Sequence, residues 1–425
     1  MLCDNPADLQ LPPMLKIRQI FDIPPAIDPA PALEREFAAI KDGLSLAPGA
    51  KVAVGVGSRG ISNLATVVAG VVRCLRSLGA EPFIIPAMGS HGGATAQGQI
   101  EVLGYRGVTE ETCGAPIRAT MEVVSLGETS CGIPLFVNRL AFEADGLVLI
   151  NRIKPHTNFI GPTESGILKM MSIGLGNQAG AEYYHRLSLV RPQYDILSTA
   201  GREAMGRSRF LFGVALVENQ NHQLCKLRLA GPERMEQVET ELMGLARAIL
   251  PRLPMEQVDI LIVEEMGKEI SGMGIDPNVV GRDVAAYGAR RETPKIARIH
   301  VRRLSAHTAG SAVGIGQADS TLRSLVNEID QQATIINCLT ACTPEAGMIP
   351  PTYDTDLDAV AAALMTIRPY TLDDLGIVYI KNTLELEELY VSQAYRAALT
   401  ADPKTEISPD PWALNFDQGM LQSPF

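Results

Sequence analysis

The stretch Lys51-Val-Ala-Val-Gly-Val-Gly-Ser-Arg-Gly60 decides the fold class. A short β-branched run that ends in glycines is typical of a buried strand. The next residues, Ile61–Leu78, have the apolar spacing of a helix, and Gly79 lies just past its end. A second buried strand, Glu81–Pro86, follows. Strand, helix and strand in this order predict a parallel unit in an α/β protein.

The same alternation continues along the chain. We expect further strands at Glu122–Ser125, Leu135–Val137, Gly146–Asn151, Phe210–Val217, Cys225–Leu229, Val258–Val263, Ala297–Leu304, Ala333–Cys338 and Gly376–Ile380. We expect further helices at Ala32–Asp42, Thr95–Leu103, Glu164–Ile173, Tyr194–Gly206, Met235–Leu250, Ser320–Asp330, Asp356–Met365 and Leu384–Ala398. Apart from the helix at Ala32–Asp42, residues 1–45 and the tail 401–425 are expected to be irregular.

These patterns predict an α/β fold of two domains, with mostly parallel sheets flanked by helices. The Pro251–Pro254 segment interrupts the alternation, so we expect one domain over residues 1–254 and a second over 255–425. In parallel sheets, ligands collect outside the carboxyl ends of the strands. We therefore expect the active site in a cleft between the two domains.

Composition excludes several classes of protein. The chain has 425 residues and a net charge of −11, which argues against nucleic-acid binding. No apolar run approaches the ~20 residues of a spanning helix, and the segment beginning at Met1 lacks the pattern of a signal peptide. Seven cysteines without a Cys-x-x-Cys pair indicate reduced thiols. We expect a cytoplasmic protein without a membrane partner.

The turn Gly55–Gly60 fits the pattern G-x-G-x-x-G after a strand and before a helix. Such a turn binds phosphate through backbone N–H groups. The acidic residue Glu81 begins the next strand, whereas a ribose-binding carboxylate should end it. Arg59 inside the turn would contact an anion directly. Nucleotide or phosphate binding, NAD binding and a plain tight turn all stay open.

A histidine follows the second strand in Gly89-Ser90-His91-Gly92. Glycines on both sides expose the backbone and leave the imidazole little to pack against. His91 is either a loop or capping residue, or a proton-transfer group at the same sheet edge as Arg59.

The densest group of polar residues follows the buried run Gly146–Ile150. Arg152, Lys154, His156 and Lys169 gather cations in an acidic chain, which indicates an anionic ligand. Lys169 has apolar neighbours on both sides, which would lower its pKa and favour a nucleophilic or covalent role. The alternative is a lysine that extends from an amphipathic helix to solvent. His185 lies sixteen residues further on at an expected helix start.

The order of these residues resembles a divergent branch of the nickel-pincer lactate racemase family, over most of the chain and most specifically in its first half. The matches are an arginine after the first strand, a histidine in a Gly-Ser-His turn, a histidine in Pro-His-x-x-Phe-x-Gly, a lysine and a final histidine. In this chain they are Arg59, His91, His156, Lys169 and His185. The family's Asp-x-Thr-Arg turn is Val56-Gly-Ser-Arg59 here, and its Gly-Gly-x-Lys is Gly166-Ile-Leu-Lys169.

The resemblance implies a role for each matched position. Lys169 would carry a nickel-pincer nucleotide, a pyridinium thioamide/thiocarboxylate mononucleotide, and His185 would bind the nickel. His91 and His156 would be the catalytic bases. We take Arg59, Ser58, Gly57, Gly60 and Lys154 as cofactor-binding residues. Assembly of such a cofactor implies cofactor-maturation enzymes as partners.

The implied reaction is racemisation or epimerisation of a 2-hydroxy acid, lactate or a larger one. The α-proton of a carboxylate is too weakly acidic for an imidazole, so hydrogen would leave C2 as hydride to the cofactor. Two bases with a pKa near 7, one per substrate face, would take the hydroxyl proton. Arg59 would bind the substrate anion, with Lys268 and Arg282 from the second domain as candidate substrate contacts or ordinary surface charges.

The sequence leaves open the function, the role of one further histidine and the oligomeric state. An NAD-dependent oxidoreductase that uses the Gly55–Gly60 turn is the first alternative, and a non-catalytic paralogue that binds a phosphorylated metabolite is the second. His307 is a further candidate residue near the site, whereas His300 lies in an expected strand and is expected to be core. The sequence also allows a homo-oligomer.

Overall fold

The computed structural model describes residues 9–284 and 291–425, and these group into two compact units. The N-terminal unit is Ile23–Leu250, and the C-terminal unit combines Met1–Asp22 with Pro251–Phe425. The predicted domains, residues 1–254 and 255–425, stay a prediction. The structure groups the first 22 residues with the C-terminal unit, because a strand from this segment pairs with strands near the end of the chain.

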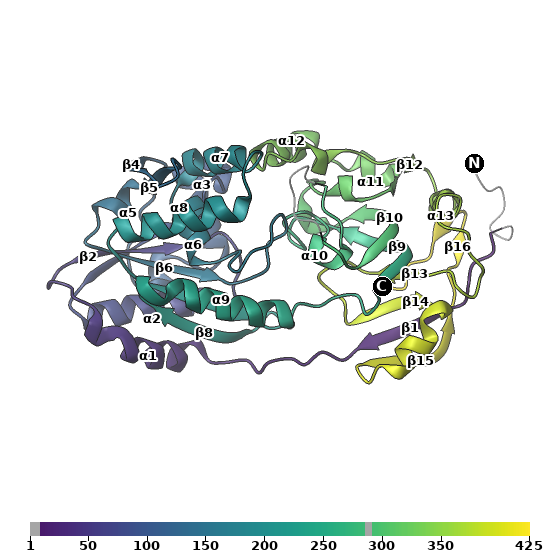
Figure 1. Ribbon diagram of the computed structural model, residues 1–425, viewed down its shortest axis with the longest axis horizontal. Coiled ribbons are helices and arrows are strands. Elements are labelled where there is room, and N and C mark those ends of the chain that lie inside the picture. The colour runs from purple at the N-terminus through teal and green to yellow at the C-terminus, as the bar shows by residue number, and fades with distance from the viewer. Residues whose placement is uncertain (1–8, 285–290) are drawn as a thin grey trace. The chain divides into compact units, whose positions relative to one another are not determined.

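A five-stranded sheet forms the centre of the N-terminal unit (Figure 1). Its order is β3-β2-β6-β7-β8, and all neighbours are parallel except β7 and β8. The strands are β2 (Lys51–Val56), β3 (Glu81–Pro86), β6 (Gly146–Arg152), β7 (Phe210–Glu218) and β8 (Leu224–Ala230). A separate antiparallel hairpin pairs β4 (Val123–Glu128) with β5 (Pro134–Asn138).

Helices cover both faces of this sheet, because alternate side chains of each strand point to opposite faces. On β2, Val52 and Val54 pack in the core under α1 and α2, whereas Ala53 packs in the core on the other face. The first face carries α1 (Pro29–Ile40), α2 (Leu64–Ser77), α3 (Ala96–Tyr105) and α4 (Glu110–Cys113). The second carries α5 (Arg139–Glu143), α6 (Ile167–Lys169), α7 (Asn177–Leu187), α8 (Gln193–Arg207) and α9 (Pro232–Ala248).

The C-terminal unit has an eight-stranded sheet in the order β12-β11-β10-β9-β13-β14-β1-β15. The first five strands are parallel, and β14, β1 and β15 are antiparallel to their neighbours. The strands are β1 (Met14–Gln19), β9 (Gln257–Met266), β10 (Lys295–Leu304), β11 (Ser320–Leu322), β12 (Thr352–Tyr353), β13 (Ile377–Ile380), β14 (Glu388–Ser392) and β15 (Thr405–Trp412). The helices are α10 (Pro277–Val280), α11 (Arg323–Asn327), α12 (Gln331–Thr340), α13 (Asp356–Leu364) and α14 (Arg396–Ala401).

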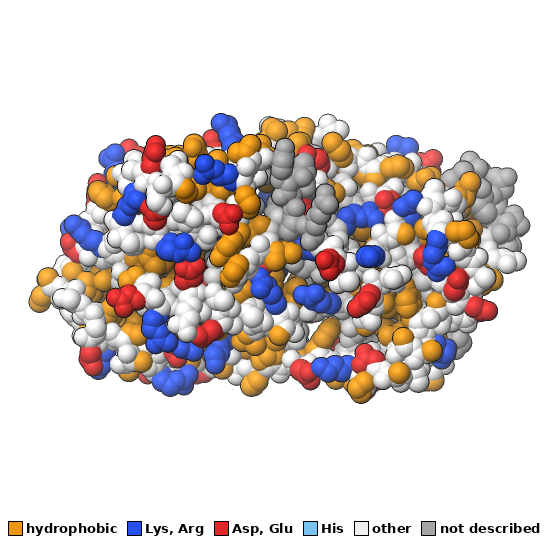
Figure 2. Space-filling model, in the orientation of Figure 1, with side chains coloured by type: hydrophobic (Ala, Val, Ile, Leu, Met, Phe, Trp, Pro, Cys, Tyr) orange, Lys and Arg blue, Asp and Glu red, His pale blue; other side chains and the backbone are white. Residues whose placement is uncertain are grey.

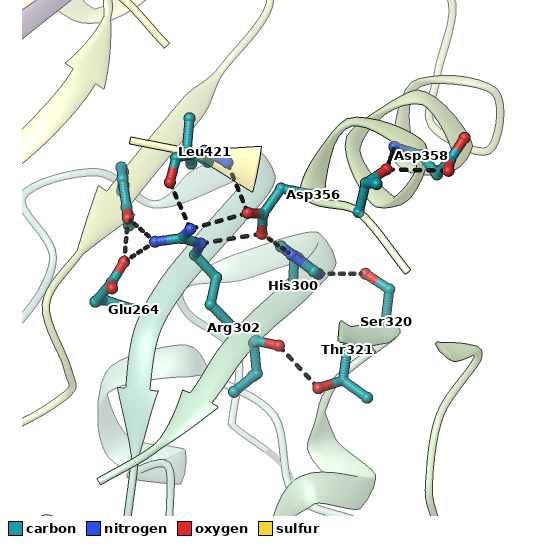
Figure 3. A network of polar contacts seen from close by, with 11 residues as sticks. Glu264, His300, Arg302, Ser320, Thr321, Asp356, Asp358 and Leu421 are labelled. Carbon is teal, nitrogen blue, oxygen red and sulfur yellow. Dashed lines mark hydrogen bonds and ion pairs between the residues drawn. The ribbon is translucent and has the colours of Figure 1, made fainter. Parts of the chain in front are cut away.

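A buried polar network ties the chain end to this sheet (Figure 3). Arg302 on β10 forms ion pairs with Asp356 and Glu264 and donates to the backbone oxygen of Leu421. His300, which is 1% exposed, is hydrogen bonded to Asp356 through Nε2 at 2.9 Å. The expectation that His300 is a core residue is therefore confirmed. The short hairpin of β16 (Phe416–Asp417) and β17 (Met420–Leu421) is held by these contacts.

Several predicted elements of the C-terminal half are wrong. Ala333–Cys338 is helical, within α12, and Leu384–Ala398 contains strand β14 rather than one helix. Ser320–Asp330 begins with strand β11 before the short helix α11. The expected irregular ends contain β1 and β15, which pair with each other. Pairing between distant segments decided these elements, and such pairing leaves no local periodicity to detect.

The predicted fold class is confirmed: both sheets are mostly parallel and helices flank them. None of the described helices is long and apolar enough to cross a membrane. Six cysteines are free thiols, and Cys3 lies outside the described residues. The segment from Met1, which is predicted to lack a signal peptide, also begins outside the described residues. On the face shown in Figure 2, described basic and acidic side chains are interspersed, without a broad field of one sign.

Candidate active site

Three neighbouring strands of the N-terminal unit bring the predicted residues to one sheet edge. The order β3-β2-β6 places β2 between the other two, and all three are parallel. His91 follows β3, Arg59 follows β2 and His156 follows β6. The loops that carry the two histidines therefore flank the loop of the arginine, at the carboxyl edge where α/β sheets bind ligands.

Lys169 lies at the end of the short helix α6, where the helix widens into a π-helical turn, Met170–Gly174. Such turns are frequent at functional sites. This turn contacts both other loops: Met170 Cε lies 3.3 Å from where a Cβ of Gly57 would be, and Gly89 N donates to Gly174 O at 3.1 Å. The observed helix α6 begins at Ile167, three residues later than the predicted start at Glu164. Glu164 therefore lies in the loop before the helix.

Burial makes Lys169 and His185 poor cations. The pKa of the Lys169 amine is lowered to about 7, first by burial and then by the Arg59 charge, against a smaller opposing effect of Glu164. The pKa of His185 on α7 is lowered to about 4, by burial and then by Lys169. A neutral amine can be acylated, and a neutral imidazole can bind a metal. The predicted lowering of the Lys169 pKa is confirmed.

The two candidate bases have opposite tautomers. Nδ1 of His91 lies 2.8 Å from the carbonyl oxygen of Met88, so this nitrogen carries the proton and Nε2 has the lone pair. Nδ1 of His156 accepts from the backbone N–H of Asn158 at 3.1 Å, so its proton sits on Nε2. In these tautomers Nε2 of His91 can accept a hydrogen bond or a proton, and Nε2 of His156 can donate a hydrogen bond.

The loop of His156 is held by groups that sequence reasoning missed. Glu164, 5% exposed, accepts from the backbone N–H of His156 and pairs with Arg247 on α9. The ring of Phe159 lies 4.4 Å from the imidazole, centroid to centroid. In the sequence, the only sign that the His156 loop would be held in this way was the acidic residue Glu164 within the densest group of polar residues.

The glycine turn is arranged differently from a dinucleotide site. Strand β2 continues to Val56, and α2 begins at Leu64, four residues beyond Gly60. The backbone N–H of Ser62 donates to a carboxylate oxygen of Glu218 at 2.6 Å. A carboxylate therefore occupies one amide on the approach to α2, a position where a phosphate would bind in a dinucleotide turn.

Arg59 is an exposed guanidinium beside two others. The surrounding protein, then the charges of Arg152 and Arg106, lower its pKa. Arg152 is neutralised by an ion pair with Glu218, and Arg106 donates to the backbone oxygen of Ser58. No described carboxylate forms an ion pair with Arg59. This arrangement favours an anionic ligand at Arg59.

The remaining predicted residues have other surroundings. Lys154 is half-buried in a backbone bridge with Ser165. Lys268, Arg282 and His307 belong to the C-terminal unit. Arg282 pairs with Asp319 at 2.6 Å and donates to backbone oxygens, while the Lys268 amine donates to Asn337. Substrate contacts of Lys268 and Arg282 stay predictions.

The residues at the site can be compared with the cofactor that the sequence resemblance implies. Among the described residues, no three histidine, cysteine or acidic side chains are grouped to hold an ion. A metal that a cofactor already holds would need few further donors from the protein. His185 could supply such a donor, and Lys169 could supply an attachment point, because the cationic form of each is disfavoured.

Comparison with known proteins agrees with this geometry. Residues 52–196 match the model of the lactate racemase N-terminal domain. No curated protein matched the chain. A lactate racemase apoprotein from Thermoanaerobacterium thermosaccharolyticum is similar in structure, with a TM-score of 0.51, 13% identity and coverage of 86% of this chain and 94% of that one. A structural genomics target from Thermotoga maritima has a TM-score of 0.51, 15% identity and coverage of 76% and 83%.

Such low identity makes the structural likeness a statement about fold alone. The family match adds more, because it spans the segment that contains Arg59, His91, His156, Lys169 and His185. Residues 52–196 therefore belong to the lactate racemase N-terminal domain family, as the order of these five residues predicted.

Proposed function

We propose that this protein is a racemase or epimerase of a 2-hydroxy acid that uses a nickel-pincer nucleotide linked to Lys169. The observation that carries the proposal is the pair of Lys169 and His185 near the Arg59 charge, whose cationic forms are both disfavoured: the pKa is about 7 for the amine and about 4 for the imidazole. A neutral amine is the form that can be acylated, and a neutral imidazole is the form that binds nickel.

The chain's own residues would move the proton and hold the anion. When bound, the cofactor supplies a hydride acceptor for C2 of the substrate. Arg59 binds the substrate carboxylate through a forked hydrogen bond. Nε2 of His91 takes the hydroxyl proton on one face, and His156, once it has been protonated from solvent, returns a proton to the substrate oxygen from the other face. For the reverse reaction the two histidines exchange roles.

The first test is intact mass with metal analysis on protein co-expressed with the cofactor-maturation enzymes, followed by peptide mapping. We expect a nucleotide-derived adduct on Lys169 and about one nickel per chain. Lys169→Ala should abolish the adduct, whereas Lys226→Ala, at an exposed lysine of β8, should keep it. An unmodified Lys169 under conditions that load a known family member would contradict the proposal.

The second test concerns turnover on a panel of 2-hydroxy acids. His91→Ala and His156→Ala should keep the adduct and lose interconversion of the enantiomers by ~100-fold or more, the usual contribution of a positioned base. Racemisation retained in both variants would rule out the two-base mechanism.

Two other outcomes identify the alternatives. A nicotinamide-dependent absorbance change with hydroxy acids would indicate an oxidoreductase at the Gly55–Gly60 turn. Thermal stabilisation by nucleotides and nickel without turnover would indicate a binding protein that has lost the reaction.

A further inference from the structure

Glu239 is a buried carboxylate that the proposed reaction does not use. It lies on α9 and is 1% exposed. One oxygen, Oε1, accepts from the backbone N–H of Ile167, and the other, Oε2, accepts from that of Leu168 at 3.2 Å. These are the two residues directly before Lys169. The carboxylate therefore satisfies both N–H groups at the start of the helix that carries the lysine.

The surroundings of this contact are tightly packed. A Cβ on Gly166 would overlap Glu239 Oε1, so any side chain at this position must displace the carboxylate. On its other side, the Gly166 oxygen accepts from Asn151 Nδ2 at 2.8 Å. A Cβ on Gly201 of α8 would likewise overlap the backbone oxygen of Leu168.

We propose that Glu239 is a positioning residue for Lys169: by accepting from the N–H groups of Ile167 and Leu168 it fixes the short helix from which the lysine side chain extends. The proposal deepens the proposed function, but it concerns the chain without cofactor. Glu239 acts through the backbone of residues 167 and 168 and does not contact the reacting atoms. No described polar side chain other than Glu239 is hydrogen bonded to either N–H group.

An acidic side chain matches both N–H groups with one acceptor oxygen each. A carboxylate has two acceptor oxygens, whereas a glutamine amide has one oxygen and an NH₂ group that would face a backbone N–H. Burial raises the pKa of Glu239 to about 7 while the two hydrogen bonds oppose the rise, so holding this group in the core has a cost. A site that keeps such a group in spite of its cost has a use for the geometry it imposes.

The test measures Lys169 directly in unloaded protein. Glu239→Gln is compared with Glu241→Gln, an exposed position on the same helix. Each protein is treated with trinitrobenzenesulfonate at pH 8, above the pKa of both Glu239 and Lys169 and at a temperature well below the thermal transition, and labelling of Lys169 is divided by labelling of exposed Lys226. We expect at least a tenfold fall in this ratio for Glu239→Gln and no change for Glu241→Gln, because a released, hydrated amine is a weaker nucleophile.

A second variant reaches the same contact from the other side. Gly166→Ala should displace the Glu239 carboxylate and lower the ratio to a similar degree, whereas Gly244→Ala, in open space on α9, should not. Both changes break the same contact. The labelling ratio of the double variant Gly166→Ala/Glu239→Gln should therefore fall no further than that of either single variant.

The outcomes separate this proposal from the function. An unchanged Lys169 ratio in folded Glu239→Gln overturns the positioning role, whatever the cofactor result. If Glu239→Gln does not fold, Gly166→Ala decides, and an unchanged ratio there overturns the proposal equally. If the falls in the labelling ratio were additive in the double variant, the two substitutions would act separately, which would contradict a shared contact of Gly166 and Glu239. A failure to load cofactor with a normal Lys169 ratio contradicts the proposed function instead.

Discussion

Individual residues at the site owe their protonation states to burial more than to charged partners. Burial is the largest cause of the lowered pKa of Lys169 and of His185, and the charges of Arg59 and Lys169 come second. The fold therefore disfavours the charged forms of this amine and this imidazole without a dedicated base beside either.

The Lys169 pKa predicts how stability depends on pH. The folded pKa of about 7 lies below the usual 10.5, so between these values the unfolded chain binds more protons than the folded one. The free energy of unfolding contributed by this group therefore rises with pH from 7 to 10.5. Lys169→Met should flatten the rise seen in urea unfolding at pH 7 and pH 10, and Lys226→Met should not. An equal slope in the wild-type protein and both variants would contradict the lowered pKa of Lys169.

The histidine tautomers are a second prediction for single residues. In ¹⁵N NMR spectra of the unloaded protein near pH 8, Nε2 should be the unprotonated nitrogen of His91, and Nδ1 that of His156. His222, in the β7–β8 turn, serves as the reference imidazole. The same tautomer in both candidate bases would contradict the assignment of one as acceptor and the other as donor in the resting protein.

Among the elements, the π-helical turn after Lys169 does most to assemble the site. Its end packs on the loop after β3, where a Cβ on Gly174 would lie 2.7 Å from the backbone oxygen of Ala87. The same turn approaches Gly57 after β2. One short segment therefore sets the spacing of three loops.

Gly174→Ala tests this packing. The added methyl group must displace backbone, so we expect a loss of about 1–3 kcal/mol in the free energy of unfolding. Gly206→Ala on α8 meets no atom within 4 Å and should be neutral or slightly stabilising. Chemical denaturation of both variants provides the measurement, and equal stabilities would contradict a tight contact at Gly174.

The wrongly predicted elements had misleading local signals. Ala333–Cys338 is rich in β-branched residues, yet Asp330 caps a helix there by accepting from Ala333 N at 2.9 Å. Thr334 and Cys338 face inward at helical spacing, while Ile335 and Ile336 stay more than half exposed. The sequence pattern treated these two isoleucines as buried, and this produced the wrong prediction of a strand.

For the whole molecule, the buried network at Arg302 joins the central sheet of the C-terminal unit to the chain end (Figure 3). Asp356 and Glu264 are at most 1% exposed, and Arg302 is their shared cation. Removing one partner of a buried ion pair leaves an uncompensated charge.

Arg302→Met should therefore lower the free energy of unfolding by about 3–5 kcal/mol. Arg202→Met, which breaks an exposed pair with Glu236, should cost at most about 1 kcal/mol. Urea unfolding of the two variants makes the comparison. Similar losses would mean that the network contributes no more than a surface contact.

Acid should act on the same network. The Asp356 pKa is lowered to about 2: burial, the largest cause, raises it, but hydrogen bonds and charges of His300 and Arg302 together outweigh burial. Between pH 3.8 and 2 the unfolded chain binds more protons, so the stabilisation by Asp356 is present above pH 3.8 and is lost as the pH falls through 2. Asp356→Asn should weaken the acid sensitivity measured between these values. An unchanged acid profile would contradict the coupling.

The sequence by itself determined the α/β class, the strands that precede Arg59, His91 and His156, and the order of the five family residues. These features depend on local signals, namely buried β-branched runs, glycine turns and polar residues at strand ends. Only the tertiary structure decided that β2 lies between β3 and β6, that Glu164 and Glu239 hold the loops and helix of the site, and that β1 joins strands of the other chain end. Those features arise from contacts between segments far apart in the chain, which have no periodicity in the sequence.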